Sequence, residues 1–135
     1  MNMKYLTCLL LAGMLVGCAT APKESHRYAW VTGLKPEKAP YYKDLHAHPW
    51  PGVMQQIKAC HIQNYSIYEK EIDGNLYLFS YLEYTGNDFA ADMARMAADP
   101  KTQEWWAIMK PMQAPVPTRA PGEWWCNLEE VFHTD

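Results

Sequence analysis

The chain has 135 residues, of which 49% are hydrophobic and 20% are charged, and its formal net charge at pH 7 is −3. This length is enough for one domain with a hydrophobic core of its own. Lysines and arginines are scattered singly, so the sequence lacks the basic stripe typical of nucleic-acid-binding proteins. It also contains no Gly-rich phosphate loop, no GxSxG motif and no CxxC motif.

The N-terminal segment, residues 1–17, has the pattern of a bacterial lipoprotein signal peptide. Lys4 precedes an apolar run that is too short to span a bilayer comfortably, and the run ends in Leu15-Val16-Gly17-Cys18. Small residues directly before a cysteine form a lipobox, in which the cysteine is lipidated and becomes the new N-terminus. The alternative is an ordinary secretory signal that happens to be followed by a cysteine.

Lipidation of Cys18 predicts a protein of the bacterial cell envelope that is anchored to a membrane. Ala19 rather than an aspartate follows the cysteine, which favours the outer membrane and the periplasm. Residues 18–26 are then a short tether, and residues 27–135 form the folded domain.

Two cysteines, Cys60 and Cys126, remain in the predicted domain. In an oxidising compartment they could form a disulfide, provided that their Cβ atoms lie about 4 Å apart. They could equally be two buried free thiols, and their spacing in the sequence leaves both alternatives open.

The predicted domain alternates strands and helices. Asp73-Gly74 is a strong hairpin signal, because both residues accept positive φ. Pro40 falls in the first turn of its helix, where proline is tolerated, and Asn87 or Asp88 caps a later helix. In chain order the predicted elements are a strand at residues 27–34, helices at 37–46 and 52–60, strands at 63–71 and 75–84, a helix from the cap to about 99, a helix at 102–112, a proline-rich loop at 112–122 and a strand at 124–133.

This order of elements predicts an α+β fold. It matches the β-α-β-β-α-β order of a ferredoxin-like sandwich, in which helices cover one face of an antiparallel sheet. The other face is left uncovered, and Tyr77, Phe79 and Tyr81 alternate onto one side of their strand. An exposed aromatic face has to bind a ligand or pair with a second copy of the chain.

The candidate chemistry lies around Tyr42 and His46. These residues are four apart, so on a helix their side chains lie on one face, one turn from each other. A phenol beside an imidazole can bind a polyol and transfer protons, since an unperturbed histidine has a pKa of about 6.5. The alternative is a core tyrosine beside a satisfied surface histidine. Two carboxylates, Asp44 and Glu130, could orient the histidine or be purely structural.

A pair of adjacent tryptophans, Trp105 and Trp106, lies on the last predicted helix. Adjacent side chains on a helix point about 100° apart, so one ring can pack in the core while the other covers an opening. Aromatic rings bind the flat C–H faces of sugars, but tryptophans also serve as ordinary core residues. The tryptophan pair by itself therefore does not decide between sugar binding and core packing.

Taken together, these segments resemble the L-rhamnose mutarotase family. The resemblance covers nearly the whole predicted domain, from about Arg27 to Phe132. It rests on a strand followed by Pro36 and then, in order, on Tyr42-x-x-x-His46-x-x-x-Trp50-Pro51, Asn64-Tyr65-x-Ile67-Tyr68, Trp105-Trp106-x-x-Met109 and Glu130-Val131-Phe132.

The resemblance implies a sugar mutarotase, an isomerase of the aldose 1-epimerase type that interconverts the α and β anomers of L-rhamnose or a related sugar without a cofactor. It implies that His46 is the proton donor and that Tyr42, Tyr65, Trp105 and Trp106 contact the sugar. It also implies a homodimer, in which two sheets face each other as a dimeric α+β barrel. Ring opening needs a second group that takes the proton of the anomeric hydroxyl, and this base stays open between water, a tyrosine and the histidine itself.

Two other functions are compatible with the same architecture. One is a non-catalytic lipoprotein that binds a sugar or another small ligand, and the other is a monooxygenase. The pair Tyr42 and His46 together with the tryptophans favours the mutarotase, because a protein that only binds does not need all of them. A metal site at His46-Ala47-His48 is not expected, since residues two apart diverge on a helix and no Glu or Cys completes a ligand set.

Overall fold

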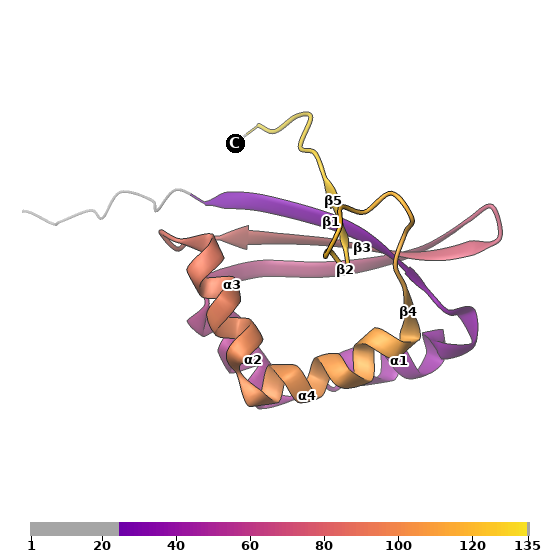
Figure 1. Ribbon diagram of the computed structural model, residues 1–135, viewed down its shortest axis with the longest axis horizontal. Helices are drawn as coiled ribbons and strands as arrows, with labels where there is room; N and C mark the ends of the chain where they lie inside the picture. The colour runs from indigo at the N-terminus through magenta and orange to yellow at the C-terminus, as the bar shows by residue number, and fades with distance from the viewer. Residues whose placement is uncertain (1–24, 135) are drawn as a thin grey trace, which may run out of the picture.

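The computed structural model describes residues 25–134. A five-stranded antiparallel sheet is covered on one face by four α-helices, so the fold is α+β as predicted (Figure 1). The predicted signal peptide, Cys18 and most of the predicted tether lie outside the described residues. Within residues 25–134, none of the helices is both long enough and apolar enough to cross a membrane.

Proline and aspartate residues determine where the helices begin. A proline lies in the first turn of three helices, where its missing N–H removes no helical hydrogen bond. Two helices are capped by aspartates: Asp88 and Asp99 accept hydrogen bonds from the backbone N–H groups of Ala91 and Thr102. In chain order the elements are β1 (His26–Leu34), the 3-10 turn η1 (Pro36–Lys38), α1 (Ala39–Ala47), α2 (Pro51–Ala59), β2 (Ile62–Ile72), β3 (Asn75–Tyr84), α3 (Phe89–Ala98), α4 (Pro100–Met109), the 3-10 turn η2 (Lys110–Met112), β4 (Gln113–Ala114) and β5 (Cys126–Leu128).

The sheet has the strand order β2-β3-β1-β4, with β5 also paired to β1, and every pair is antiparallel. The hairpin between β2 and β3 is confirmed, since Asp73 and Gly74 adopt φ angles of 49° and 74°. In β3, Leu78 and Leu82 are buried beneath the helices, and the alternating aromatic residues point to the other face.

The C-terminal part of the sheet differs from the prediction. The sequence predicts a loop followed by a single strand at residues 124–133, whereas two short strands, β4 and β5, both pair with β1. The close approach of β4 requires Gly33, because a Cβ atom there would collide with the carbonyl oxygen of Ala114. Residues 129–133 are irregular and exposed, since no strand within the described residues pairs with them.

Two hydrophobic clusters fill the space between the sheet and the helices. The second cluster contains Cys60, which is fully buried, whereas Cys126 lies on β5, and both are free thiols. The buried members of the first cluster are Leu34, Ala39, Tyr42, Val53, Leu78, Trp105, Met109 and Met112, and those of the second are Cys60, Ile62, Leu82, Tyr84 and Met96.

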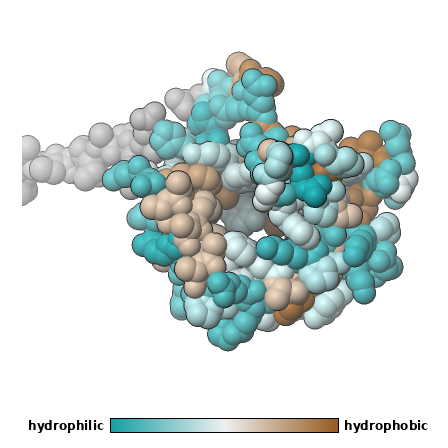
Figure 2. All heavy atoms as spheres, in the orientation of Figure 1, coloured by the Kyte–Doolittle hydropathy of each residue, from teal (hydrophilic) through white to brown (hydrophobic). Residues whose placement is uncertain are grey.

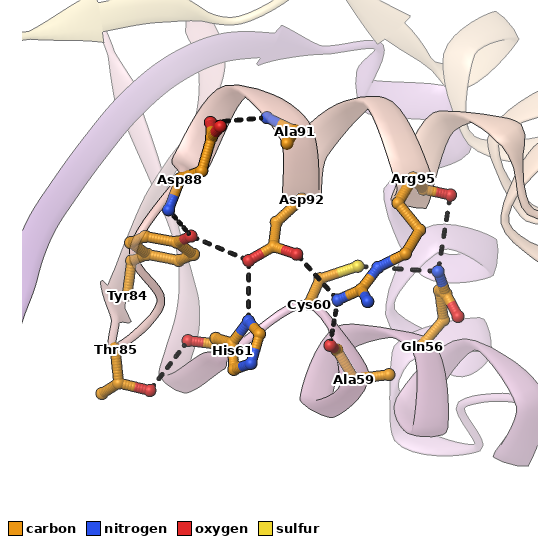
Figure 3. Close-up of polar contacts among 10 residues, drawn as sticks. All are labelled: Gln56, Ala59, Cys60, His61, Tyr84, Thr85, Asp88, Ala91, Asp92 and Arg95. Atoms are coloured by element: carbon orange, nitrogen blue, oxygen red, sulfur yellow. Dashed lines mark hydrogen bonds and ion pairs between the residues drawn. The ribbon is translucent and has the colours of Figure 1, made fainter.

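A polar network closes the second cluster at its edge (Figure 3). Asp92 of α3 accepts hydrogen bonds of 2.7 Å from both His61 Nδ1 and the Tyr84 hydroxyl, and it pairs with Arg95 at 2.7 Å. The hydrogen bonds from His61 and Tyr84 hold the pKa of the Asp92 carboxyl below its usual value. Arg95 also donates to the carbonyl oxygen of Ala59. The network therefore fixes the start of β2 and the end of β3 against α3.

Candidate functional site

His46 lies on α1, one turn after Tyr42, and its imidazole stacks on the phenol ring at a centroid distance of 4.1 Å. Nδ1 lies 2.8 Å from the backbone carbonyl oxygen of Tyr42. Because a carbonyl oxygen can only accept, Nδ1 carries the proton and donates it. Nε2 makes no hydrogen bond within residues 25–134 and is left to act on a ligand.

Burial lowers the pKa of His46 below 6.5, and the hydrogen bond to the Tyr42 carbonyl opposes this shift only in part. The neutral imidazole is therefore the resting form at neutral pH. With its proton on Nδ1, this form presents a lone pair at Nε2.

Neither of the two carboxylates suggested by the sequence orients His46. The Asp44 carboxylate lies 3.6 Å from His48 Nδ1, and Glu130 pairs with Arg27 Nε at 2.7 Å. The backbone carbonyl of Tyr42 orients the imidazole instead of a carboxylate. No sequence pattern marks such a contact, because every residue in a helix has a carbonyl group four residues before it.

One tryptophan contacts the imidazole, and a second packs against the first. The Trp105 ring meets His46 edge-on at a centroid distance of 5.3 Å, and Trp50 meets Trp105 in the same way at 5.3 Å. Trp105 belongs to the first cluster and is only 7% exposed, whereas Trp106 is partly buried at its margin. The two neighbouring rings thus divide between core and margin, as their angular separation on a helix predicts.

Tyr65 reaches the same region from β2 through a β-bulge. The strand register shifts between Gln63 and Ser66, and Asn64 within the bulge adopts a φ of 48°. Ser66 lies opposite Tyr81 on the outer face, so Tyr65 before it points towards the helices. Tyr65 as a whole is 44% exposed, yet its hydroxyl group lies deep among protein atoms. The hydroxyl group of Tyr65 thus lies near the Tyr42 phenol, while part of the side chain stays accessible to a ligand.

The phenols of Tyr42 and Tyr65 both stay protonated at neutral pH. Burial raises the pKa of Tyr65 to about 12. Burial, followed by the nearby Tyr65 phenol, raises the pKa of Tyr42, while a hydrogen-bonding interaction with the Gln113 side chain partly offsets the rise. Protonated phenols can donate hydrogen bonds to sugar hydroxyls and accept hydrogen bonds from them, but they are poor bases. Of the three bases that the sequence leaves open, water and His46 therefore remain.

Three further residues belong to this region and were missed by the sequence analysis. Gln113 of β4 is 6% exposed and lies opposite Leu34, beside the Tyr42 hydroxyl. Trp124 donates a hydrogen bond of 2.6 Å from Nε1 to Gln113 Oε1. Lys110 Nζ lies 5.5 Å from the ring centroids of both Trp106 and Trp124. Of the three, only Trp124 could have been found from the sequence, because it forms a second tryptophan doublet with Trp125.

Other kinds of site lie elsewhere or have no counterpart in the described chain. Within residues 25–134 no three His, Cys, Asp or Glu side chains gather as a metal ion would require. A separate cleft adjoins β1 and β5 and contains neither His46 nor any of the four predicted sugar contacts. It is lined by Arg27, Tyr28, Ala29, Tyr81, Asn127, Leu128, Glu129 and Glu130.

Known proteins match both the sequence and the fold. The L-rhamnose mutarotase family matches residues 27–134. The chain belongs to this family. It is 29% identical over 110 residues to the L-rhamnose mutarotase of Oceanobacillus iheyensis, covering 81% of this chain and 98% of that protein. It is 34% identical over 108 residues to the L-rhamnose mutarotase of Sinorhizobium fredii, covering 79% and 96% of the two chains.

The crystal structure of an L-rhamnose mutarotase from Formosa agariphila has the same fold. Its TM-score is 0.61 at 25% sequence identity, and the match covers 82% of this chain and 99% of that chain. The family resemblance is thus confirmed, and the described domain corresponds to nearly the whole length of these carbohydrate isomerases.

We expect His46 to have a pKa below 6.5 in the folded protein and to carry its neutral-state proton on Nδ1. Burial disfavours the imidazolium, and the Tyr42 carbonyl selects the tautomer. Long-range ¹H–¹⁵N NMR spectra recorded across the titration measure both properties, with the urea-unfolded chain as the control. A folded-state pKa at or above 6.5, or a proton on Nε2, would contradict this description of the site.

Proposed function

We propose that this protein is an L-rhamnose mutarotase that interconverts the α and β anomers of L-rhamnose or a closely related sugar. The observation that carries the proposal is the imidazole of His46: a backbone carbonyl fixes Nδ1, and Nε2, beside phenol and indole rings, has no hydrogen-bond partner among residues 25–134. Membership of the L-rhamnose mutarotase family supports the same reaction.

His46 transfers the proton in this proposal. Mutarotation opens the pyranose ring, lets the aldehyde group rotate, and closes the ring on the other face. In the neutral form that burial favours, His46 Nε2 takes the proton of the anomeric hydroxyl, directly or through water. The imidazolium formed in this way donates a proton to the ring oxygen as the bond between that oxygen and the anomeric carbon breaks, and the same transfers run in reverse as the ring closes. This acid–base sequence involves no redox change and needs no cofactor.

The surrounding aromatic residues bind the sugar in this proposal. Tyr42 and Tyr65 keep their phenolic protons and can hydrogen-bond the sugar hydroxyls. Trp105 and Trp106 offer apolar surface to the C–H face of the ring. A protein that only binds sugars would need these four side chains but not an oriented imidazole.

We expect His46→Ala to slow anomer exchange by roughly 100-fold or more, since general acid–base groups typically contribute about 10²–10⁴-fold. Saturation-transfer NMR on L-rhamnose anomers measures the exchange rate. His48→Ala is the matched control, because His48 is exposed and its imidazole contacts Asp44. Equal loss in both variants, or exchange that survives in His46→Ala, would overturn the mechanism, and a wild type that binds the sugar without exchanging anomers would favour the non-catalytic alternative.

A second copy of the chain is proposed to cover the outer face of the sheet, which would make the ferredoxin-like sandwich half of a dimeric α+β barrel. The helices lie on one side of the sheet only (Figure 1). Tyr68 on β2 is 63% exposed opposite Phe79, and Val131 and Phe132 after β5 are 90% and 79% exposed. Apolar groups at this exposure favour burial against a partner.

We expect a stable homodimer that buries about 1,600 Å² in total, the size of a standard interface. Tyr68→Glu should shift the protein towards monomer in light scattering, because it places a charge in the interface. Met54→Glu is the control, since Met54 is also exposed, at 40%, but lies on α2 in the helical layer. A wild type that is monomeric at micromolar concentration would rule out this assembly.

We also propose that the protein is a lipoprotein of the bacterial cell envelope, anchored through Cys18, on the strength of Leu15-Val16-Gly17-Cys18. Metabolic labelling with a fatty acid is expected to tag the wild type and to fail in Cys18→Ala. Cys8→Ala serves as the control, because it changes a cysteine within the same segment but outside the lipobox. Labelling that persists in Cys18→Ala would refute the anchor.

A further inference from the structure

One side chain of the proline-rich loop contacts both sides of the proposed sugar site. The indole N–H of Trp124 bonds to Gln113, whose amide interacts with the Tyr42 phenol. The ammonium group of Lys110 lies over the ring of Trp124 and over that of Trp106, at 5.5 Å from each ring centroid. Trp124 is thus connected to a proposed sugar contact on α1 and to another on α4.

The fold holds Gln113, which links Trp124 to Tyr42, in place. Gln113 lies opposite Leu34 in the short strand β4, and the missing side chain of Gly33 permits that pairing. Lys35 adds two bonds to the preceding turn, from its backbone N–H to the carbonyl of Met112 at 2.9 Å and from Nζ to that of Pro111 at 2.8 Å. These backbone contacts therefore fix the position of Gln113 before its side chain makes any contact.

The loop that carries Trp124 is bonded within itself. Arg119 donates to the carbonyl oxygens of Val116 and Glu123, each at 3.0 Å, and the Glu123 carboxylate accepts from the N–H of Ala120 at 3.1 Å. At the end of the loop, Trp125 packs against the first cluster. The loop rises from β4 in Figure 1, and the molecular surface in Figure 2 is hollowed between the sheet and the helices on this side.

The direction of the hydrogen bonds has a chemical consequence. An indole N–H can only donate, so it engages the amide oxygen of Gln113 and leaves the amide NH₂ to face Tyr42. The Tyr42 oxygen then accepts from Gln113, and its own proton is free to point elsewhere. Because Gln113 is 6% exposed, water does not readily replace either partner.

We propose that Trp124 is a positioning residue for the mutarotase site, which through Gln113 makes the Tyr42 hydroxyl a hydrogen-bond donor to the sugar and through Lys110 holds the ring of Trp106. This inference rests on the proposed function. It assigns to the loop between β4 and β5 a role in sugar binding rather than in proton transfer.

The test uses the full-length protein and Trp124→Phe, which keeps an aromatic ring for Lys110 but removes the N–H donor. We expect the rhamnose concentration that half-saturates anomer exchange to rise roughly three- to tenfold, the effect of losing one hydrogen bond, while the limiting rate changes less than about twofold. Gln113→Glu should give a similar rise, because an ionised carboxylate cannot donate to Tyr42. Combining Trp124→Phe with Gln113→Leu should cost no more than Gln113→Leu alone, because both changes break one chain of contacts.

Trp125→Phe is the matched control and should leave the half-saturating concentration unchanged. A purely structural role for Trp124 would instead lower the melting temperature and the limiting rate together. Independently of activity, NMR of ¹³C-labelled tyrosine should show the Tyr42 ring resonance shifted in Trp124→Phe but not in Trp125→Phe. An unshifted resonance, or a shifted one with unchanged half-saturation, would overturn the proposal. A wild type without anomer exchange would defeat the proposed function, and the resonance would still decide whether Trp124 holds Tyr42.

Discussion

The hydrogen bond from His46 Nδ1 to the backbone carbonyl of Tyr42 is the contact on which the rest of the site depends. It fixes the tautomer, aims Nε2 away from the helix, and sets the plane of the ring that stacks on Tyr42. The bond exists only while α1 is helical, and a helix of nine residues is not stable by itself in water. Burial of Ala39 and Tyr42 in the first cluster supplies the missing stability. The orientation of the imidazole is therefore a consequence of core packing.

Core and site are not separate regions of this domain. Tyr42 and Trp105 are 3% and 7% exposed and contribute to the first cluster, yet both contact the imidazole. A rigid environment of this kind limits the freedom of each ring without needing a large number of polar contacts. The same burial keeps the phenol of Tyr42 protonated and the imidazole of His46 neutral. One packing arrangement therefore preserves a hydrogen-bond donor on Tyr42 and a basic nitrogen on His46.

The sequence predicted those features that depend on local chemistry. The hairpin at Asp73-Gly74, a cap at Asn87 or Asp88 and the one-turn spacing of Tyr42 and His46 follow from turn preferences, capping and helical periodicity, and the structure contains all three, with Asp88 as the cap. The strand β4 inside the predicted loop, and the shortening of the predicted last strand to β5, were not predictable, because two and three residues carry too little periodicity to be read as strands. Gln113 and Lys110 were missed for a related reason: their contacts join segments that meet only after the sheet has formed.

The bulge at Asn64 has a consequence for the variation that this domain can accept. The extra residue in β2 lets Ile62 and Tyr65 both point to the inside, while Gln63 and Ser66 stay opposite Glu83 and Tyr81. Side chains alternate between the two faces of a strand, so inserting or deleting one residue anywhere between the bulge and the hairpin would send this phenol to the opposite face. Substitutions that preserve chain length leave the alternation intact. The segment should therefore tolerate changes of residue identity far better than changes of length, and an alignment gap within it would mark a homologue in which this phenol no longer faces the Tyr42 side of the sheet.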